Sequence, residues 1–80
     1  MDIDNLVRMA NRIGEFFAAL PDVQEARAGV AGHLQRFWDP RMRREIVAHL
    51  EQRGGAGLDA IVREAIAAHR DGLVPAGEGG

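Results

Sequence analysis

The spacing of apolar residues predicts helices along most of the chain. Apolar side chains recur every three or four residues, which places them on one side of an α-helix. The segments with this spacing are residues 3–20, 23–37, 40–53 and 58–70. No alternating strand pattern and no internal repeat interrupts them. We therefore predict an all-α fold, a small bundle of four helices joined by short turns, in one domain spanning residues 1–71.

Polar residues and glycines mark the ends of these helices. Asp22 and Asp39 precede the second and third helices, where a carboxylate accepts hydrogen bonds from the free N–H groups of the first turn. Pro40 follows Asp39 and suits a first helical position. Gly54 and the glycine after it favour a helix end, because glycine readily adopts the left-handed conformation. Residues 72–80 are rich in glycine and proline, which predicts a flexible tail.

The first helix carries two adjacent apolar stripes. The first stripe follows one helix face and comprises Leu6, Ala10, Ile13 and Phe17. The second stripe lies beside it and comprises Met9, Phe16 and Leu20. A face this wide needs two neighbours. Either both stripes pack against helices of the same bundle, or the second stripe contacts another protein.

The second predicted helix contains two interior glycines, Gly29 and Gly32. Each costs about 1 kcal/mol relative to alanine in an exposed helix. They indicate either the close approach of another backbone or a weak helix.

The junction of the second and third helices concentrates aromatic and basic residues. Trp38 falls at the bend and either closes the core there or serves as a binding anchor. Three arginines follow within the first turn of the next helix, where positive charge faces the positive end of the helix dipole: Arg41, Arg43 and Arg44. They form a solvated basic edge, a protein-contact patch or a nucleic-acid contact. The net charge of −2 disfavours the last.

Composition leaves few residue types for chemistry. The sequence has no Cys, Ser, Thr, Tyr or Lys, which removes the usual nucleophiles. His33, His49 and His69 lie far apart in the sequence, without the spacing of a local metal site. We expect no catalytic, cofactor or metal site in this chain. The absence of a long apolar run and of a signal-peptide pattern leads us to expect a soluble, cytoplasmic protein.

Three pieces of the sequence together resemble a known family. Residues 6–17 run LVRMANRIGEFF, residues 33–43 run HLQRFWDPRMR, and Gly57-Leu58 begins a last helix that contains Ala65. In this order and at this length they resemble the delta subunit family of bacterial NAD-dependent formate dehydrogenases. The resemblance covers about residues 4–70.

The resemblance implies a role beside a catalyst. Such delta subunits accompany a cytoplasmic enzyme of several subunits that oxidises formate at a molybdenum or tungsten bis-pterin centre. Its electrons pass through iron–sulfur clusters to FMN and NAD in other subunits. The delta subunit itself is associated with assembling, stabilising or maturing the enzyme. The implied partner is the large molybdenum-pterin subunit, with no membrane involved, and self-association stays open.

We expect this chain to dock on the large subunit through an aromatic anchor flanked by arginines, since these residue types dominate interface hot spots. The candidate contact residues are Phe37, Trp38, Arg41, Arg43, Arg44, Met9, Asn11 and Phe16. Two alternatives stay open. In one, the chain is a maturation factor whose arginines transiently bind the phosphates of the pterin cofactor. In the other, it is a stand-alone helical module that binds nucleic acid.

Overall fold

A computed structural model describes residues 2–74, and every regular element within them is a helix. The elements are α1 (Ile3–Phe17), α2 (Val23–Phe37), α3 (Pro40–Arg53), α4 (Ala60–Ala68) and α5 (Arg70–Leu73). The all-α prediction is confirmed, and the described residues form five helices rather than the four expected. None of these helices is long and apolar enough to cross a membrane.

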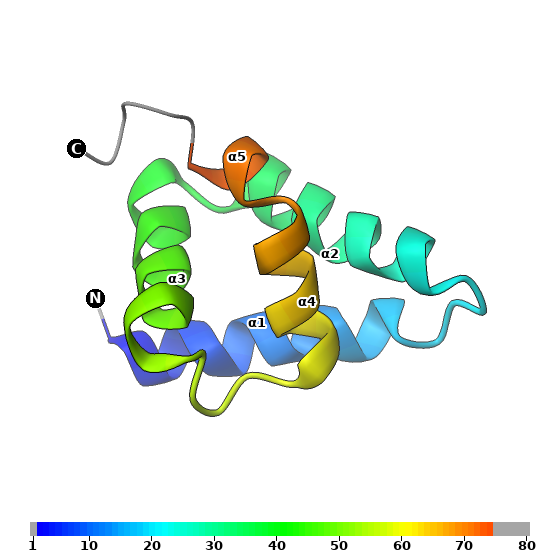
Figure 1. The fold of residues 1–80 in the computed structure, drawn as a ribbon, viewed down its shortest axis with the longest axis horizontal. Coiled ribbons are helices and arrows are strands. Elements are labelled where there is room, and N and C mark those ends of the chain that lie inside the picture. Colours follow the sequence, from blue (N-terminus) through cyan, green and yellow to red (C-terminus); the bar gives the residue numbers. More distant parts are fainter. Residues whose placement is uncertain (1, 75–80) are drawn as a thin grey trace.

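The helices surround α4. Figure 1 shows α1 and α2 diverging from the turn that joins them, with α3 standing on the side away from that turn. The short helix α4 lies between these three and contacts each of them, while α5 contacts α2 and α3. This arrangement leaves α1 and α2 each with one side facing outward.

Each of the five helices supplies buried side chains to the core. The side chains with almost no exposed surface include Leu6, Val30, Leu34, Ile46, Val62, Ile66 and Leu73. The buried positions of α1 and α2 recur mainly at intervals of four residues, as Leu6, Ala10 and Gly14 do in α1, in agreement with the sequence pattern. Burying an aliphatic side chain of this size contributes about 1.5–3 kcal/mol. This cluster is therefore the main source of stability in a chain without disulfides.

The predicted capping residues perform that role. The Asp22 carboxylate accepts hydrogen bonds from the backbone N–H groups of Gln24 and Glu25, at 2.8 and 3.2 Å. The Asp39 carboxylate accepts one from the N–H of Met42 at 3.1 Å, and Pro40 occupies the first position of α3. Gly54 ends α3 with a φ of 68°, the left-handed conformation expected of it. Local chemistry therefore sets these boundaries.

Several boundaries differ from the prediction, and one of them is the start of α4, which lies at Ala60 rather than at residue 58. Helix α1 ends at Phe17 rather than at residue 20, because Pro21 disfavours helix at the residue before it and the N–H of Leu20 bonds to the Phe17 carbonyl in a turn. The last predicted helix is divided at His69, whose φ and ψ of −117° and 24° are not helical. Leu73 and Val74, which the prediction placed in the tail, are buried in the core. The rest of the predicted tail, residues 75–80, lies outside the described residues.

Glycine allows close packing at two points in α1 and α2. At Gly14, an added Cβ would lie 2.6 Å from Cγ2 of Val62, so the glycine lets α1 approach the side chains of α4. At Gly29, an added Cβ would lie 2.3 Å from Cδ1 of Phe17, so the ring lies directly against α2. A Cβ at Gly32 would meet nothing within 4 Å. The close neighbour predicted at Gly29 exists, but it is an aromatic ring rather than a backbone.

Candidate docking surface

A row of four aromatic rings runs from the end of α1 onto α2. The rings of Phe16 and Phe17 meet edge to face, with centroids 5.0 Å apart. The Phe17 ring lies 6.5 Å from the His33 ring, which lies 4.7 Å from the ring of Phe37. We call these four residues the aromatic strip. Its ends, Phe16 and Phe37, are 73% and 70% exposed, the highest values among the large apolar residues of positions 2–74.

The glycine at position 29 explains how the strip forms. Phe17 belongs to the first apolar stripe of α1 and packs against the core, with its ring in the space that Gly29 leaves on α2. Phe16, the neighbouring residue in the chain, therefore points outward. His33 and Phe37 follow Gly29 at intervals of four residues, which places all three along one side of α2.

Two open hollows flank the contact between Phe17 and His33. One has a volume of about 330 Å³ and is lined by Arg12, Ile13, Phe16, Phe17 and His33. The other, of about 300 Å³, is lined on α2 by small residues together with Arg36 and Phe37. The hollows thus have apolar and aromatic floors, and each has one arginine among its lining residues.

The second apolar stripe of α1 is not covered by the bundle. Met9 and Phe16 on α1 are exposed, and so is Leu20 in the turn that follows, although α1 supplies Leu6 and Ala10 to the core. The interpretation that both stripes pack against helices of the same bundle is therefore wrong. What stays a prediction is that another protein contacts the second stripe.

Trp38 lies inside the fold. Its side chain is 5% exposed and belongs to the core cluster, at the bend between α2 and α3. Of the two interpretations of this residue, core closure is the one that the structure supports. Phe37, the preceding residue, is exposed instead, and the partner contact predicted for Trp38 stays a prediction.

Asn11 also has a structural role within the chain. Its Nδ2 donates a hydrogen bond to the carbonyl of Gly57 at 2.9 Å, and its Oδ1 accepts one from the N–H of Asp59 at 2.8 Å. The side chain thus fixes the turn before α4 to the middle of α1. Asp59 makes no side-chain cap of its own at the start of α4, so Asn11 supplies a hydrogen-bond acceptor there.

The three arginines near the start of α3 differ in exposure. Arg41 and Arg44 are exposed, and Arg43 is half-buried. The Nε atom of Arg43 is buried and has no hydrogen-bond partner among residues 2–74. The contact of these three arginines with a partner stays a prediction.

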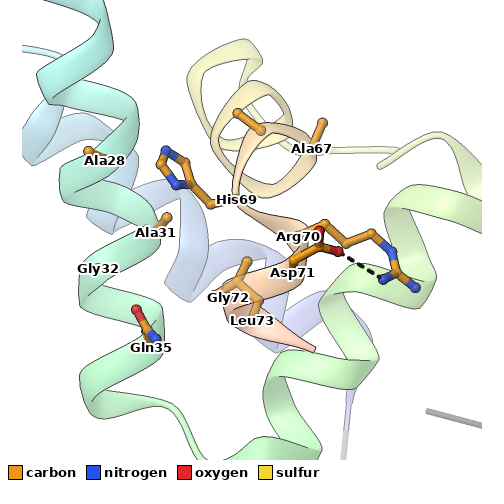
Figure 2. A pocket seen from close by; sticks show the side chains of 11 residues that line it. Ala28, Ala31, Gly32, Gln35, Ala67, His69, Arg70, Asp71, Gly72 and Leu73 are labelled. Carbon is orange, nitrogen blue, oxygen red and sulfur yellow. Dashed lines mark ion pairs between the residues drawn. The ribbon is translucent and has the colours of Figure 1, made fainter. Parts of the chain in front are cut away.

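Another hollow lies between α2 and the junction of α4 with α5. It has a volume of about 460 Å³ and is lined mainly by alanines and glycines, with Gln35 and His69 among its polar residues. Figure 2 shows Arg70 turned away from it, toward α3. There Arg70 donates a hydrogen bond to Glu51, and this contact raises the pKa of Arg70 above its ordinary value.

The three histidines stay apart in the fold. His33 belongs to the aromatic strip, the Nε2 atom of His49 lies 2.8 Å from the carbonyl oxygen of Ala56, and His69 stands at the end of α4. Within residues 2–74, no group of three or more His, Cys, Asp or Glu side chains is placed to hold a metal ion.

Comparison with known proteins adds the decisive observation. The family model for the NADH-dependent formate dehydrogenase delta subunit FdsD matches residues 5–66. The chain belongs to this family. The matched segment of this FdsD family member contains the whole aromatic strip and all of α1 from its third residue, α2, α3 and most of α4. A search of curated proteins and a search of solved structures each return no match.

The match and the geometry together separate five of the eight predicted contact residues into two groups. Met9, Phe16 and Phe37 are exposed large apolar residues of a delta-subunit family member. Trp38 and Asn11 serve the fold of the chain itself. Phe17 and His33 complete the surface but were not among the predicted residues. The signal that reveals His33 is its spacing of four residues from both Gly29 and Phe37.

Proposed function

We propose that this chain is a non-catalytic accessory subunit of a cytoplasmic NAD-dependent formate dehydrogenase. It docks on the molybdenum-pterin subunit and stabilises or assembles the active enzyme. The observation that carries the proposal is the exposed aromatic strip on a chain of the delta-subunit family. An interface would explain why Phe16 and Phe37 are exposed, since neither side chain is part of the core of the chain.

The energetics of the surface support docking. Phe16 and Phe37 each retain at least 70% of their exposed surface in the folded chain. Complete burial of a phenylalanine side chain contributes about 1.5–3 kcal/mol, and aromatic residues are enriched in interface hot spots. Contiguous exposed apolar patches on small proteins often mark sites of protein contact.

The scarcity of side chains that could bind a metal cluster supports an accessory role. The sequence has no cysteine and therefore no thiolate for an iron–sulfur cluster, and its histidines lie apart. We assign the molybdenum or tungsten bis-pterin, the iron–sulfur clusters, FMN and NAD to other subunits of the complex. The contribution of this chain is a surface that binds and orients another subunit.

Co-expression with the other subunits tests the proposal. The tagged chain is expected to co-purify with the large subunit in constant ratio, and its omission is expected to lower the yield or the formate-dependent NAD reduction of the complex. A large subunit that is recovered at full activity and never binds the chain would contradict the proposal. Binding only to a large subunit that lacks its pterin cofactor would favour the maturation-factor alternative.

A further inference from the structure

We infer that the aromatic strip accepts an apolar segment of the large subunit that carries carboxylates beside its apolar side chains. This inference rests on the proposed function and specifies the chemistry of the partner. It follows from the shape of the strip, from the charges around it and from the pairing of the arginines elsewhere in the chain.

The shape of the surface suits a segment with more than one apolar side chain. The hollow beside Phe16 and the hollow beside Phe37 share Phe17 and His33 as a common wall. Apolar side chains from one partner segment that enter both hollows would lie on either side of this wall. Recognition of a segment by successive apolar anchors in neighbouring pockets is a common mode of docking.

The charges at the hollows are of one sign. Arg12 lines the first hollow and Arg36 lines the second, and no carboxylate lines either one. The chain as a whole has a net charge of −2, so this positive rim is a local feature. Carboxylates on the partner segment would complement it, because a guanidinium group can bind a carboxylate through two parallel hydrogen bonds.

The two rim arginines differ from Arg27 and Arg70, which form ion pairs within the chain. Arg27 pairs with Glu64 at 3.0 Å, and Arg70 pairs with Glu51. Within the described part of the chain, neither Arg12 nor Arg36 pairs with a carboxylate. Both are therefore available to a partner without breaking an existing ion pair.

The same charges disfavour a second copy of the chain as the occupant. A two-fold symmetric contact sets a patch against itself, which would bring the rims with Arg12 and Arg36 together. Like charges brought together at an interface oppose association. Arginines beside aromatic rings also occur in surfaces that bind single-stranded nucleic acid, but the negative net charge disfavours that occupant.

Binding of chain variants to the enzyme complex purified without its delta subunit tests the inference. The variants are F16A/F37A, R12E/R36E, and the controls V23A and R53E, which change an exposed valine and an exposed arginine outside both hollows. Circular dichroism establishes that each variant is folded. Affinity is measured at low and at high salt, and sedimentation of each chain alone reports self-association.

We expect F16A/F37A to weaken binding by about tenfold or more at both salt concentrations, as loss of interface anchors does. R12E/R36E should weaken it by about tenfold at low salt and by less at high salt, because salt screens the repulsion. The controls should bind within about twofold of the original chain.

Each other outcome contradicts a defined part of the reasoning. If R12E/R36E binds as tightly as the original chain, with the same salt dependence, the acidic partner segment is wrong while the proposed function stands. If F16A/F37A binds normally, the strip is not the interface. A dimer of the chain alone that F16A/F37A dissociates would make a second copy the occupant. Binding of single-stranded RNA that R12E/R36E abolishes would make nucleic acid the occupant. Failure of the original chain to bind overturns both the inference and the proposed function.

Discussion

Two glycines in α2 form a matched pair whose replacement by alanine should change stability in opposite directions. Gly29 and Gly32 lie three residues apart in the interior of the same helix. Alanine at either position gains about 1 kcal/mol of helix propensity. The environment of the added methyl group therefore decides the sign of each change.

The structure gives the two environments. At Gly32 an added Cβ meets nothing within 4 Å, so we expect G32A to stabilise the fold by about 0.5–1 kcal/mol. At Gly29 the added Cβ would lie 2.3 Å from Cδ1 and 2.5 Å from Cε1 of Phe17, so the ring must move. Overpacking of this kind costs about 1–3 kcal/mol. After subtraction of the propensity gain, we expect G29A to destabilise the fold by about 1 kcal/mol.

Urea unfolding followed by circular dichroism measures both changes as free energies of unfolding. The two variants should differ by about 2 kcal/mol, and about 1 kcal/mol shifts the melting temperature of a domain this small by about 4–8 °C. In an F17A background the obstruction is gone, so G29A should then stabilise the fold as G32A does. If G29A stabilises the original chain as much as G32A, the packing of Phe17 against Gly29 is refuted, and with it our explanation of the aromatic strip.

Two further substitutions separate core and structural residues from surface residues. Trp38→Ala should lower the free energy of unfolding by about 3–5 kcal/mol because the indole is in the core. Phe37→Ala, at an exposed position, should change it by less than about 0.5 kcal/mol. Equal effects of the two substitutions in urea unfolding would contradict the assignment of Trp38 to the core. Asn11→Ala removes both hydrogen bonds that fix the start of α4 and should lower the free energy of unfolding by about 1–3 kcal/mol. The control Asn5→Ala, at an exposed position of the same helix, should change it little. Faster amide exchange at the N–H of Asp59 in Asn11→Ala alone would confirm that the lost hydrogen bonds are the cause.

The sequence predicted most of the helix boundaries because their causes are local. Asp22 and Asp39 cap the helices that follow them, and Gly54 ends α3, as expected. The break at His69 and the burial of Leu73 were not predictable in this way, because α5 is held by contacts with α2 and α3. Glycine and proline content near the end of the chain suggested a tail where the core continues.

The candidate surface was predicted in part. The width of the apolar face of α1 indicated that one stripe needed a second neighbour, and Met9 and Phe16 are exposed. The same pattern could not show that Asn11 bonds to residues more than forty positions away, or that Trp38 turns inward. Phe17 and His33 join the surface only because Gly29 lets a ring from α1 rest on α2, a contact that requires the tertiary structure.

The central claim is that the aromatic strip is covered by the large subunit. Hydroxyl-radical footprinting of the chain, free and in the assembled formate dehydrogenase, measures the accessibility of individual side chains. Phe16 and Phe37 should label readily in the free chain and lose most of that labelling in the complex, while the buried Trp38 labels weakly in both. Unchanged labelling of Phe16 and Phe37 in the complex would contradict the account.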